Sequence, residues 1–501
     1  MIADGERSGP STGRWWLLLA GATALHAAVA VVTPLSGDEA YYWDLSRHPA
    51  WSTFDQPPLV LWSMVPFRLV LGETALAVRA PAIVASLAIA LLMLPLARRL
   101  GGGVGEAALA YLVLHATPLV LFGSSYVSTD IVMTACFVGA AWAAVAIAQG
   151  DRRGWWGFGL AAGLGFLAKF PMVAVLIAVV RLLRMRHVRA QLRTLTPWLA
   201  GATSLMLTAP VWIWGARHGW DNVTFQSGRV PDAARFSVRH VVEFVAANLA
   251  LSSFVGVAFA VAWWRARARR EPGWVAVRWV AGASFVLFAA FALRGRVAAH
   301  WGAPTLVLSA LLLVFHRFRG WKIWTLAGAA TSVVLLALVL AICADPAAFI
   351  ARCRTAGGGP LAAIPADKLA RMVGYDETAA VLRDVLRPGE IVASESYSMV
   401  HLVAFAAGGT LPVHLADVNR GVHGLAALYW FPPERFDGVD LVWVTGRRET
   451  LVALADICRE VHPLPPVVVR ARGEPVREIT MARCLEARPA PGVMSRLPPG
   501  R

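Results

Sequence analysis

The sequence predicts a polytopic α-helical membrane domain followed by a small α/β domain. Of the 501 residues, 57% are hydrophobic and 16% are charged, whereas soluble globular domains carry about 25% charged residues. Long apolar stretches alternate with short basic clusters up to residue 343, and shorter alternating segments follow. This composition excludes an ordinary soluble enzyme, a disordered protein and a disulfide scaffold.

The apolar stretches predict about eleven membrane-spanning helices, since one span needs about 20 apolar residues. The candidate segments are 15–34, 75–97, 106–123, 131–149, 155–168, 171–183, 197–214, 240–262, 275–293, 301–315 and 323–343. The two short segments meet at Lys169-Phe170-Pro171, where the proline is expected to end or kink a helix. The first segment is predicted to be an anchor and not a cleaved signal.

The net charge of +16 indicates membrane topology or contact with anionic membrane lipids, and not nucleic-acid binding. Residues 1–343 hold 29 of the 47 Lys/Arg and 14 of the 31 Asp/Glu, which leaves 18 and 17 for residues 344–501. The basic clusters are 98–99, 152–153, 181–193, 265–270 and 317–322. A cytoplasmic N-terminus places all five clusters inside and, with an odd number of spans, places loop 35–74 and the tail outside.

The tail differs in kind from the rest of the chain. Residues 1–343 are predicted to form the membrane domain, 344–366 a linker, and 367–501 an extracytoplasmic α/β domain. Strands are predicted at 390–394, 411–415, 440–445 and 477–485, and helices at 376–386, 397–407 and 449–459. The five cysteines show no metal-ligand spacing, and a Cys458–Cys484 disulfide and free buried thiols both remain open.

Loop 35–74 carries the most informative motif in the chain. It contains Gly37-Asp38-Glu39-Ala40-Tyr41-Tyr42-Trp43, then His48-Pro49, and then Phe54-Asp55-Gln56-Pro57-Pro58. Acidic residues beside a membrane helix are costly unless they are solvated or used. Taken alone, the motif fits interfacial acids within an aromatic belt as well as it fits a reactive site.

This motif resembles the first extracytoplasmic loop of GT-C glycosyltransferases in the protein O-mannosyltransferase-like branch, which includes the bacterial aminoarabinose transferases. Further segments are similar in family order: Ser128-Thr129-Asp130, 163–170, 210–229 and 300–304. The chain departs from the family pattern at three places. Gln56 replaces a histidine, Gly215 replaces an asparagine, and His300-Trp301-Gly302 replaces Asn-Trp-Pro.

The resemblance implies an inverting glycosyltransferase at the outer face of a bacterial inner membrane. It would transfer a hexose or pentose from a polyprenyl-phosphate donor to an envelope lipid, glycan or protein. Asp38 matches the first acid of the motif and is the predicted general base, because an acceptor hydroxyl needs one. Glu39 would hold the acceptor or, with Asp38, a divalent cation such as magnesium or manganese; the alternative is no cofactor.

The phosphate of such a donor calls for cationic side chains. Lys169, one of three lysines against 44 arginines, is predicted to contact it, and a snorkelling cation is the alternative. Arg294 and Arg296 are predicted to clamp the same phosphate, and Arg229 is a weaker candidate.

Further residues are predicted to contact substrate, each with a structural alternative such as helix capping or an interfacial belt. These residues are Tyr41, Tyr42, His48, Asp55, Gln56, Asp130 and His300.

Two rival functions remain. One is a transporter or flippase of lipid-linked sugars, although the chain lacks the internal repeats usual in transporters. The other is a binding protein of the same family that has lost catalysis.

Overall fold

The computed structural model describes residues 12–228, 236–416 and 424–488. The chain forms two compact units, each assembled from segments that are distant in sequence. Unit 1 contains Met1–Ala30, Ala50–Ser63 and Arg79–Ala337, and unit 2 contains Val31–Pro49, Met64–Val78 and Leu338–Arg501. The predicted division of the chain near residue 343 stays a prediction, and α18 (Pro346–Thr355) occupies part of the predicted linker.

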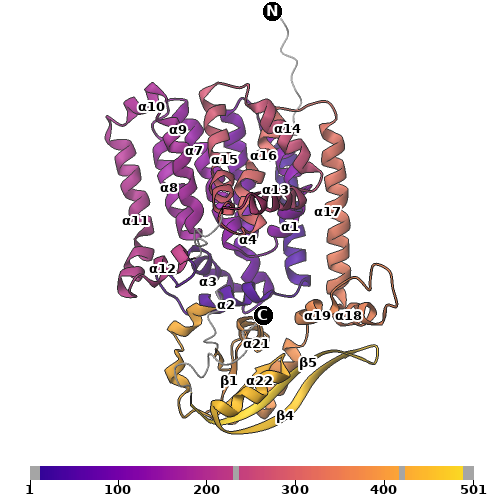
Figure 1. The fold of residues 1–501 in the computed structure, drawn as a ribbon. Helices are drawn as coiled ribbons and strands as arrows, with labels where there is room; N and C mark the ends of the chain where they lie inside the picture. Colours follow the sequence, from indigo (N-terminus) through magenta and orange to yellow (C-terminus); the bar gives the residue numbers. More distant parts are fainter. Residues whose placement is uncertain (1–11, 229–235, 417–423, 489–501) are drawn as a thin grey trace, which may run out of the picture. The chain divides into compact units, whose positions relative to one another are not determined.

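Long apolar helices form the framework of unit 1. Six helices in the described part of the chain are long and apolar enough to cross a membrane: α1 (Thr12–Val32), α4 (Ala75–Arg99), α7 (Thr129–Ala148), α11 (Leu195–Arg217), α15 (Pro272–Ala292) and α17 (Trp321–Ala344). A bilayer core offers no hydrogen-bond partners to a bare backbone, so such sequences form continuous helices. The α7 helix packs beside α8 (Gly154–Ala168), which packs beside α11 (Figure 1). The chain is therefore a multi-pass membrane protein.

Shorter helices occupy the other predicted spans. They are α5 (Val104–His115), α6 (Pro118–Gly123), α8, α9 (Val175–Leu182) and α16 (Ala303–Phe315). The predicted break at Lys169-Phe170-Pro171 is confirmed, because α8 ends at Ala168 and a 3-10 turn, η1 (Phe170–Ala174), follows. Short helices α10 (Arg186–Gln191) and α12 (Asp221–Gly228) and the 3-10 turn η2 (Ala299–Gly302) complete the connections.

The predicted span at 240–262 is bent in its middle, as a broken span or a re-entrant loop. The segment forms two helices, α13 (Val238–Ser252) and α14 (Val255–Ala266), which are bent by 111°. Ser253 lies between them with a φ of 52°, a positive value that is uncommon for residues other than glycine. The apolar run is continuous through the bend, so hydropathy alone did not reveal it.

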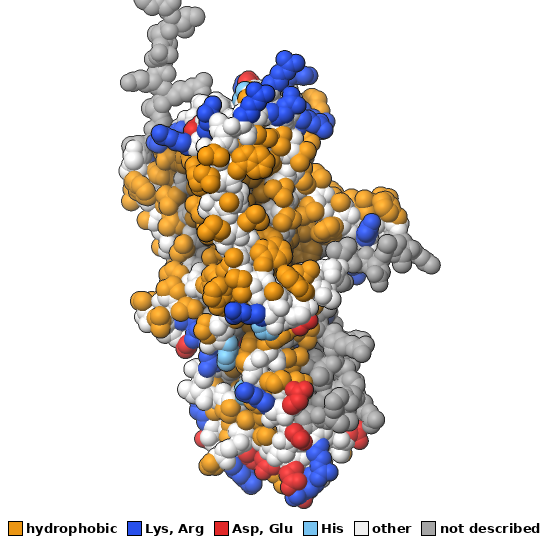
Figure 2. All heavy atoms as spheres, turned by 90° about the vertical axis from the view of Figure 1, so that its left-hand side faces the viewer, with side chains coloured by type: hydrophobic (Ala, Val, Ile, Leu, Met, Phe, Trp, Pro, Cys, Tyr) orange, Lys and Arg blue, Asp and Glu red, His pale blue; other side chains and the backbone are white. Residues whose placement is uncertain are grey.

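The basic clusters gather at one end of unit 1. Arg99 Nη2 lies 2.6 Å from Asp151 Oδ2, and His187 Nε2 lies 2.8 Å from the carbonyl oxygen of Ala148. These contacts join the end of α4, the end of α7 and the start of α10. Figure 2 shows Lys and Arg side chains at the end that carries α10, next to an apolar band. An excess of Lys and Arg on one side of the membrane is typical of multi-pass membrane proteins.

Unit 2 combines helices from the first loop with those of the tail. From the first loop come α2 (Gly37–Arg47) and the second half of α3 (Leu59–Leu71). The tail adds α18, α19 (Ala366–Leu369), η3 (Ala370–Met372), α20 (Tyr375–Val385), α21 (Tyr397–Ala406), η4 (Leu425–Tyr429), η5 (Pro433–Phe436), α22 (Arg448–Ala453) and η6 (Leu454–Asp456). The α2 helix packs against α21, which also contacts α20 and the strand β2 (Val413–Leu415).

A five-stranded sheet in the order β2-β1-β3-β5-β4 forms the core of unit 2. Its strands are β1 (Ile391–Ser394), β2 (Val413–Leu415), β3 (Leu441–Thr445), β4 (Cys458–Ala471) and β5 (Glu474–Ala487). The first three are parallel, with Val392 opposite Val413 and Val442, and β5 runs antiparallel to β3 and β4. Trp443 and Phe436 are fully buried beside the sheet.

The structure corrects the tail prediction at one point and confirms it at another. The predicted helix 449–459 ends early, because β4 begins at Cys458. The Cys458–Cys484 disulfide is present and joins β4 to β5. The predicted α/β architecture is confirmed.

Candidate functional site

The acidic pair of the first loop lies in the first turn of α2. Ser36 caps this helix: its Oγ accepts a hydrogen bond from the Glu39 N–H at 3.2 Å, and its own N–H donates to Glu39 Oε2 at 3.0 Å. This reciprocal pattern is a capping box. Glu39 is fully buried, so its carboxylate acts in holding the start of the helix that carries Asp38.

Asp38 is held by a tyrosine from the tail. The Tyr397 hydroxyl, in the first turn of α21, donates to Asp38 Oδ1 at 2.9 Å. Burial, followed by the negative charge of Asp38, raises the pKa of Tyr397 to about 12. Tyr397 therefore keeps its proton and remains a donor at neutral pH. The two residues are 359 positions apart, so no local sequence pattern pairs them.

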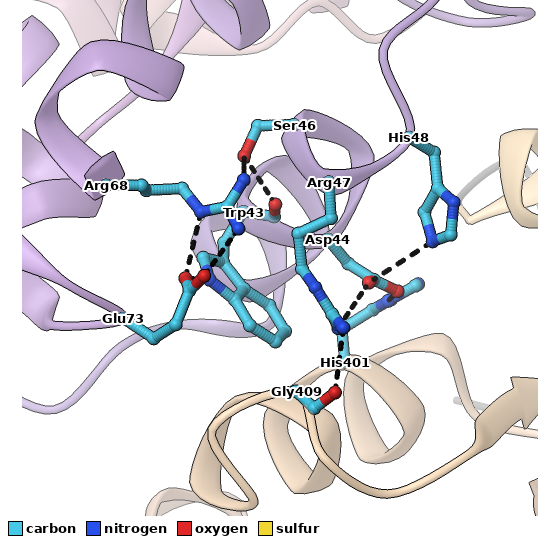
Figure 3. Close-up of polar contacts among 9 residues, drawn as sticks. All are labelled: Trp43, Asp44, Ser46, Arg47, His48, Arg68, Glu73, His401 and Gly409. Atoms are coloured by element: carbon cyan, nitrogen blue, oxygen red, sulfur yellow. Dashed lines mark hydrogen bonds and ion pairs between the residues drawn. The ribbon is translucent and has the colours of Figure 1, made fainter.

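A second, buried contact joins the same two helices one turn further along (Figure 3). His401 Nδ1 lies 2.9 Å from Asp44 Oδ2, and both side chains are buried. Burial by itself would raise the pKa of Asp44, but hydrogen bonding to His401 and the nearby positive charges hold it below its usual value. Arg47 adds a hydrogen bond from Nη2 to the Gly409 carbonyl oxygen at 2.8 Å. The α2–α21 pair is thus fixed at both ends.

A neighbouring cluster ties α2 to α3 and the turn that follows it. Arg68 Nε donates to Glu73 Oε2 at 2.8 Å, and Arg68 Nη1 donates to Ser46 Oγ at 3.0 Å (Figure 3). The Trp43 indole N–H also donates to Glu73. These contacts orient the helix on which Asp38 lies.

The tyrosine and histidine side chains of the first loop that were predicted to contact substrate mostly are buried or stack on other rings. Tyr41 is 3% exposed and packs against His401, with ring centroids 4.9 Å apart. The Tyr42 ring lies 6.1 Å from that of Tyr41. His48 stacks on Trp430 at 4.3 Å. Tyr41 therefore serves the packing of α2 on α21, and its role in substrate binding stays a prediction.

In unit 1, three predicted residues come together at the break after α8. Lys169 Nζ lies 2.7 Å from both carboxylate oxygens of Asp130, at the start of α7, and 5.1 Å from the centre of the Trp301 ring. His300 Nε2 lies 3.7 Å from Asp130 Oδ2. An ammonium group has three donors, and the carboxylate takes two. Trp301 was not predicted as part of the site, although it belongs to the 300–304 motif.

The predicted arginines lie elsewhere. Arg296 lies 3.7 Å from Glu243 of α13, and its side chain is 78% exposed. Arg294 is exposed. Within the ranges that the structure covers, neither arginine forms an ion pair with Asp130, which pairs with Lys169 and His300. Arg229 lies outside the described residues.

The second part of the first-loop motif is bound to α12. Gln226 Nε2 donates to the Asp55 carbonyl oxygen at 2.8 Å, and the rings of Phe54 and Phe225 lie 4.5 Å apart. Asp55 is buried, and its Oδ1 lies 3.3 Å from Thr53 Oγ1. The Gln56 N–H donates to the same Thr53 oxygen at 3.1 Å. Two motifs that resemble the family therefore meet in space.

Packing accounts for the glycine at position 215. A Cβ added to Gly215 would lie 2.8 Å from Asn222 Oδ1. Asn222 is buried, and its amide nitrogen lies 3.4 Å from the Val211 carbonyl oxygen. The space that a larger residue at 215 would need is occupied by the asparagine side chain at 222.

Both acids of the pair make contacts within the protein, and the predicted magnesium or manganese ion at Asp38 and Glu39 stays a prediction. Glu39 is engaged with the backbone of its own helix, and Asp38 accepts from Tyr397. Among the residues that the structure describes, no group of three or more His, Cys, Asp or Glu side chains could hold a metal ion. Hard cations take six or more oxygen ligands, so we derive no step through a metal.

Comparisons with known proteins agree with this architecture. Residues 55–214 match the dolichyl-phosphate-mannose-protein mannosyltransferase family. The fold is similar to that of ArnT from Cupriavidus metallidurans bound to undecaprenyl phosphate, with a TM-score of 0.69, 17% identity, and coverage of 94% of this chain and 98% of that one. Apo ArnT matches with a TM-score of 0.67, 16% identity and the same coverage. No curated protein matches the chain. The chain has the GT-C fold, and the predicted resemblance is confirmed.

Proposed function

We propose that this protein is an inverting glycosyltransferase that moves a sugar from a polyprenyl-phosphate donor to an acceptor of the bacterial envelope. Asp38 carries the proposal, because it is the first acid of the motif and a neutral Tyr397 holds its Oδ1. The resemblance to ArnT and its complex with undecaprenyl phosphate supports the donor class. We place the protein in the inner membrane, with the basic end of unit 1 in the cytoplasm.

In the proposed reaction Asp38 acts as the general base. An acceptor hydroxyl attacks the anomeric carbon, the bond from that carbon to the phosphate oxygen breaks, and Asp38 takes the hydroxyl proton. The leaving group is the polyprenyl phosphate. Lys169 offers a positively charged donor for this phosphate while Asp130 orients it, because charge-assisted hydrogen bonds are the strongest that phosphate accepts.

The test of the base is mass spectrometry of envelope glycans from a deletion strain complemented with variants. Asp38→Asn should leave the product missing at normal protein level. Asp384→Asn, the same change on an exposed part of α20, should restore it. Tyr397→Phe should lower the product while the protein accumulates normally. Restoration by Asp38→Asn would refute the base and favour a transporter of lipid-linked sugars.

The test of Lys169 must separate phosphate binding from folding. Lys169→Ala alone deprives the buried Asp130 carboxylate of its nearest cation, the Lys169 ammonium at 2.7 Å, which is destabilising whatever the function. The informative comparison is Asp130→Asn against Asp130→Asn/Lys169→Ala. A higher donor requirement in the double variant, with the acceptor requirement unchanged, supports the phosphate contact. Equal donor requirements would show that Lys169 is a structural partner of Asp130.

A further inference from the structure

The parallel part of the unit 2 sheet contains a topological switch point. The chain passes from β1 through α21 to β2 on one side of β1, and β3 pairs with the other side of β1. The connections that leave the carboxyl ends of β1 and β3 therefore diverge. In open α/β sheets, ligands bind in the crevice outside the carboxyl ends of the strands at this point.

A cavity of about 500 Å³ lies at this switch point. Its lining includes Glu395 and Ser396, directly after β1, and Gly446 and Arg447, directly after β3. The volume falls within the range of roughly 300–1,000 Å³ that is usual for small-molecule sites. All of the lining residues belong to unit 2.

Three helices begin at the cavity wall. Gly37 of α2, Tyr375 of α20 and Ser398 of α21 line it, and each lies in the first turn of its helix. A helix N-terminus carries a partial positive charge and favours anions. These helices have 11, 11 and 10 residues, so each is long enough to contribute to the field inside the cavity.

Arginine side chains add formal positive charge to the same wall. The cavity is lined by Arg354, Arg371, Arg447 and Arg477, against Asp367, Glu395 and Glu478. Asp367 pairs with Arg354 at 2.7 Å, and its side chain is 91% exposed.

Of the three acidic side chains in the lining, Glu395 is expected to repel a bound anion least, because it is buried and hydrogen-bonded. Its oxygens lie 2.6 Å from Thr445 Oγ1, 3.4 Å from Thr450 Oγ1 and 3.1 Å from Trp443 Nε1. Burial raises the pKa of Glu395. The remaining lining therefore favours a negatively charged ligand.

We propose that this cavity is a binding site for a phosphorylated saccharide. The guanidinium group of arginine can donate two parallel hydrogen bonds to a phosphate, and helix N-termini favour the same negative charge. The hydroxyls of Ser36, Ser396 and Ser398 line the cavity and can hydrogen-bond to the hydroxyl groups of a sugar. The test of this site does not depend on the proposed transfer reaction, because binding is measured without turnover.

The test is calorimetric binding of glucose phosphate to the purified full chain in detergent, with glucose as the neutral probe. Wild-type protein should bind glucose phosphate and not glucose. Arg447→Gln should weaken binding by about tenfold or more, as expected for the loss of one charge-assisted contact. Arg470→Gln is the matched control, since it makes the same change on an exposed part of β4 and should bind as wild type does.

A second variant fills the cavity without depending on charge. A Cβ added at Gly446 meets no atom within 4 Å, so Gly446→Phe is expected to fold and to block binding. Wild-type affinity in both Gly446→Phe and Arg447→Gln would overturn the proposal, as would equal binding of glucose and glucose phosphate.

The same assay in nanodiscs distinguishes a soluble ligand from a lipid headgroup. Phosphatidylinositol phosphate added to phosphatidylcholine discs should compete with glucose phosphate if the site accepts lipid-borne headgroups. Unchanged affinity would assign the site to a soluble sugar phosphate. Either result supports the phosphosaccharide site, and the absence of glucose phosphate binding in phosphatidylcholine discs overturns it.

Discussion

Replacing Asp44 by asparagine should loosen α21 from α2 far more than the loss of an exposed ion pair would. Asp44 and His401 have side-chain exposures of 7% and 0%, and their polar atoms lie 2.9 Å apart. Removing one partner of a buried pair costs about 3–5 kcal/mol. We expect about 3 kcal/mol, because asparagine can still accept one hydrogen bond.

Asp367→Asn is the matched control for this variant. It removes an ion pair of 2.7 Å in the same unit, but the Asp367 side chain is 91% exposed. An exposed pair contributes about 0.2–1 kcal/mol. The two variants thus make the same chemical change and differ in burial.

The assay is hydrogen–deuterium exchange of peptides that cover α21, with peptides from α7 as an internal reference. A loss of 3 kcal/mol corresponds to roughly hundredfold faster exchange where local opening limits it. Asp44→Leu/His401→Leu should exchange more slowly than Asp44→Asn, since no buried group is left unpaired. Equal acceleration by Asp44→Asn and Asp367→Asn would refute the argument from burial.

Three further predictions concern unit 2 and the Lys169 cluster. Burial lowers the pKa of His414 from 6.5 to about 4, so unit 2 should lose stability as the pH falls from 6.5 towards 4, by up to about 3 kcal/mol. His414→Phe, which preserves the stack on Phe431, should flatten this dependence in urea unfolding at pH 7 and pH 5; an unchanged slope would contradict the assignment. Gly37→Ala should destabilise unit 2 by about 1–3 kcal/mol, because its Cβ would lie 2.4 Å from Ser398 Oγ, and Gly37→Ala/Ser398→Gly should recover most of that loss in thermal unfolding. Lys169→Met should lower the thermal stability of unit 1 more than Arg296→Met, whose side chain is 78% exposed; similar melting temperatures would count against a buried Lys169–Asp130 pair.

The sequence predicted the elements whose signals are local. Apolar length located the six long helices α1, α4, α7, α11, α15 and α17, since every residue of a membrane helix contributes to one hydropathy average. Lys169-Phe170-Pro171 located the break after α8, because proline restricts its own backbone and that of the residue before it. Alternation located β1, β2, β3 and β5. The acidic motif identified Asp38 and Glu39 but placed them in a loop beside the first membrane helix, whereas they lie in the first turn of the separate helix α2.

The edge strand β4 was missed for a physical reason. It contains Pro463, Pro465 and Pro466, and proline argues against a central strand because it cannot donate to the ladder. Edge strands tolerate proline, and β4 is the last strand in the order β2-β1-β3-β5-β4. Which strand lies at the edge is decided by the sheet and not by the strand's own residues.

The chain by itself determined a multi-pass helical protein with an α/β tail and an acidic first-loop motif. Only the tertiary structure decided the partners of the candidate site residues. Tyr397 meets Asp38 across 359 positions, Lys169 meets Asp130 across 39, and the 240–262 run bends by 111°. Hydropathy and alternation are sums over neighbouring residues, whereas these contacts depend on how distant helices pack, so no local pattern encodes them.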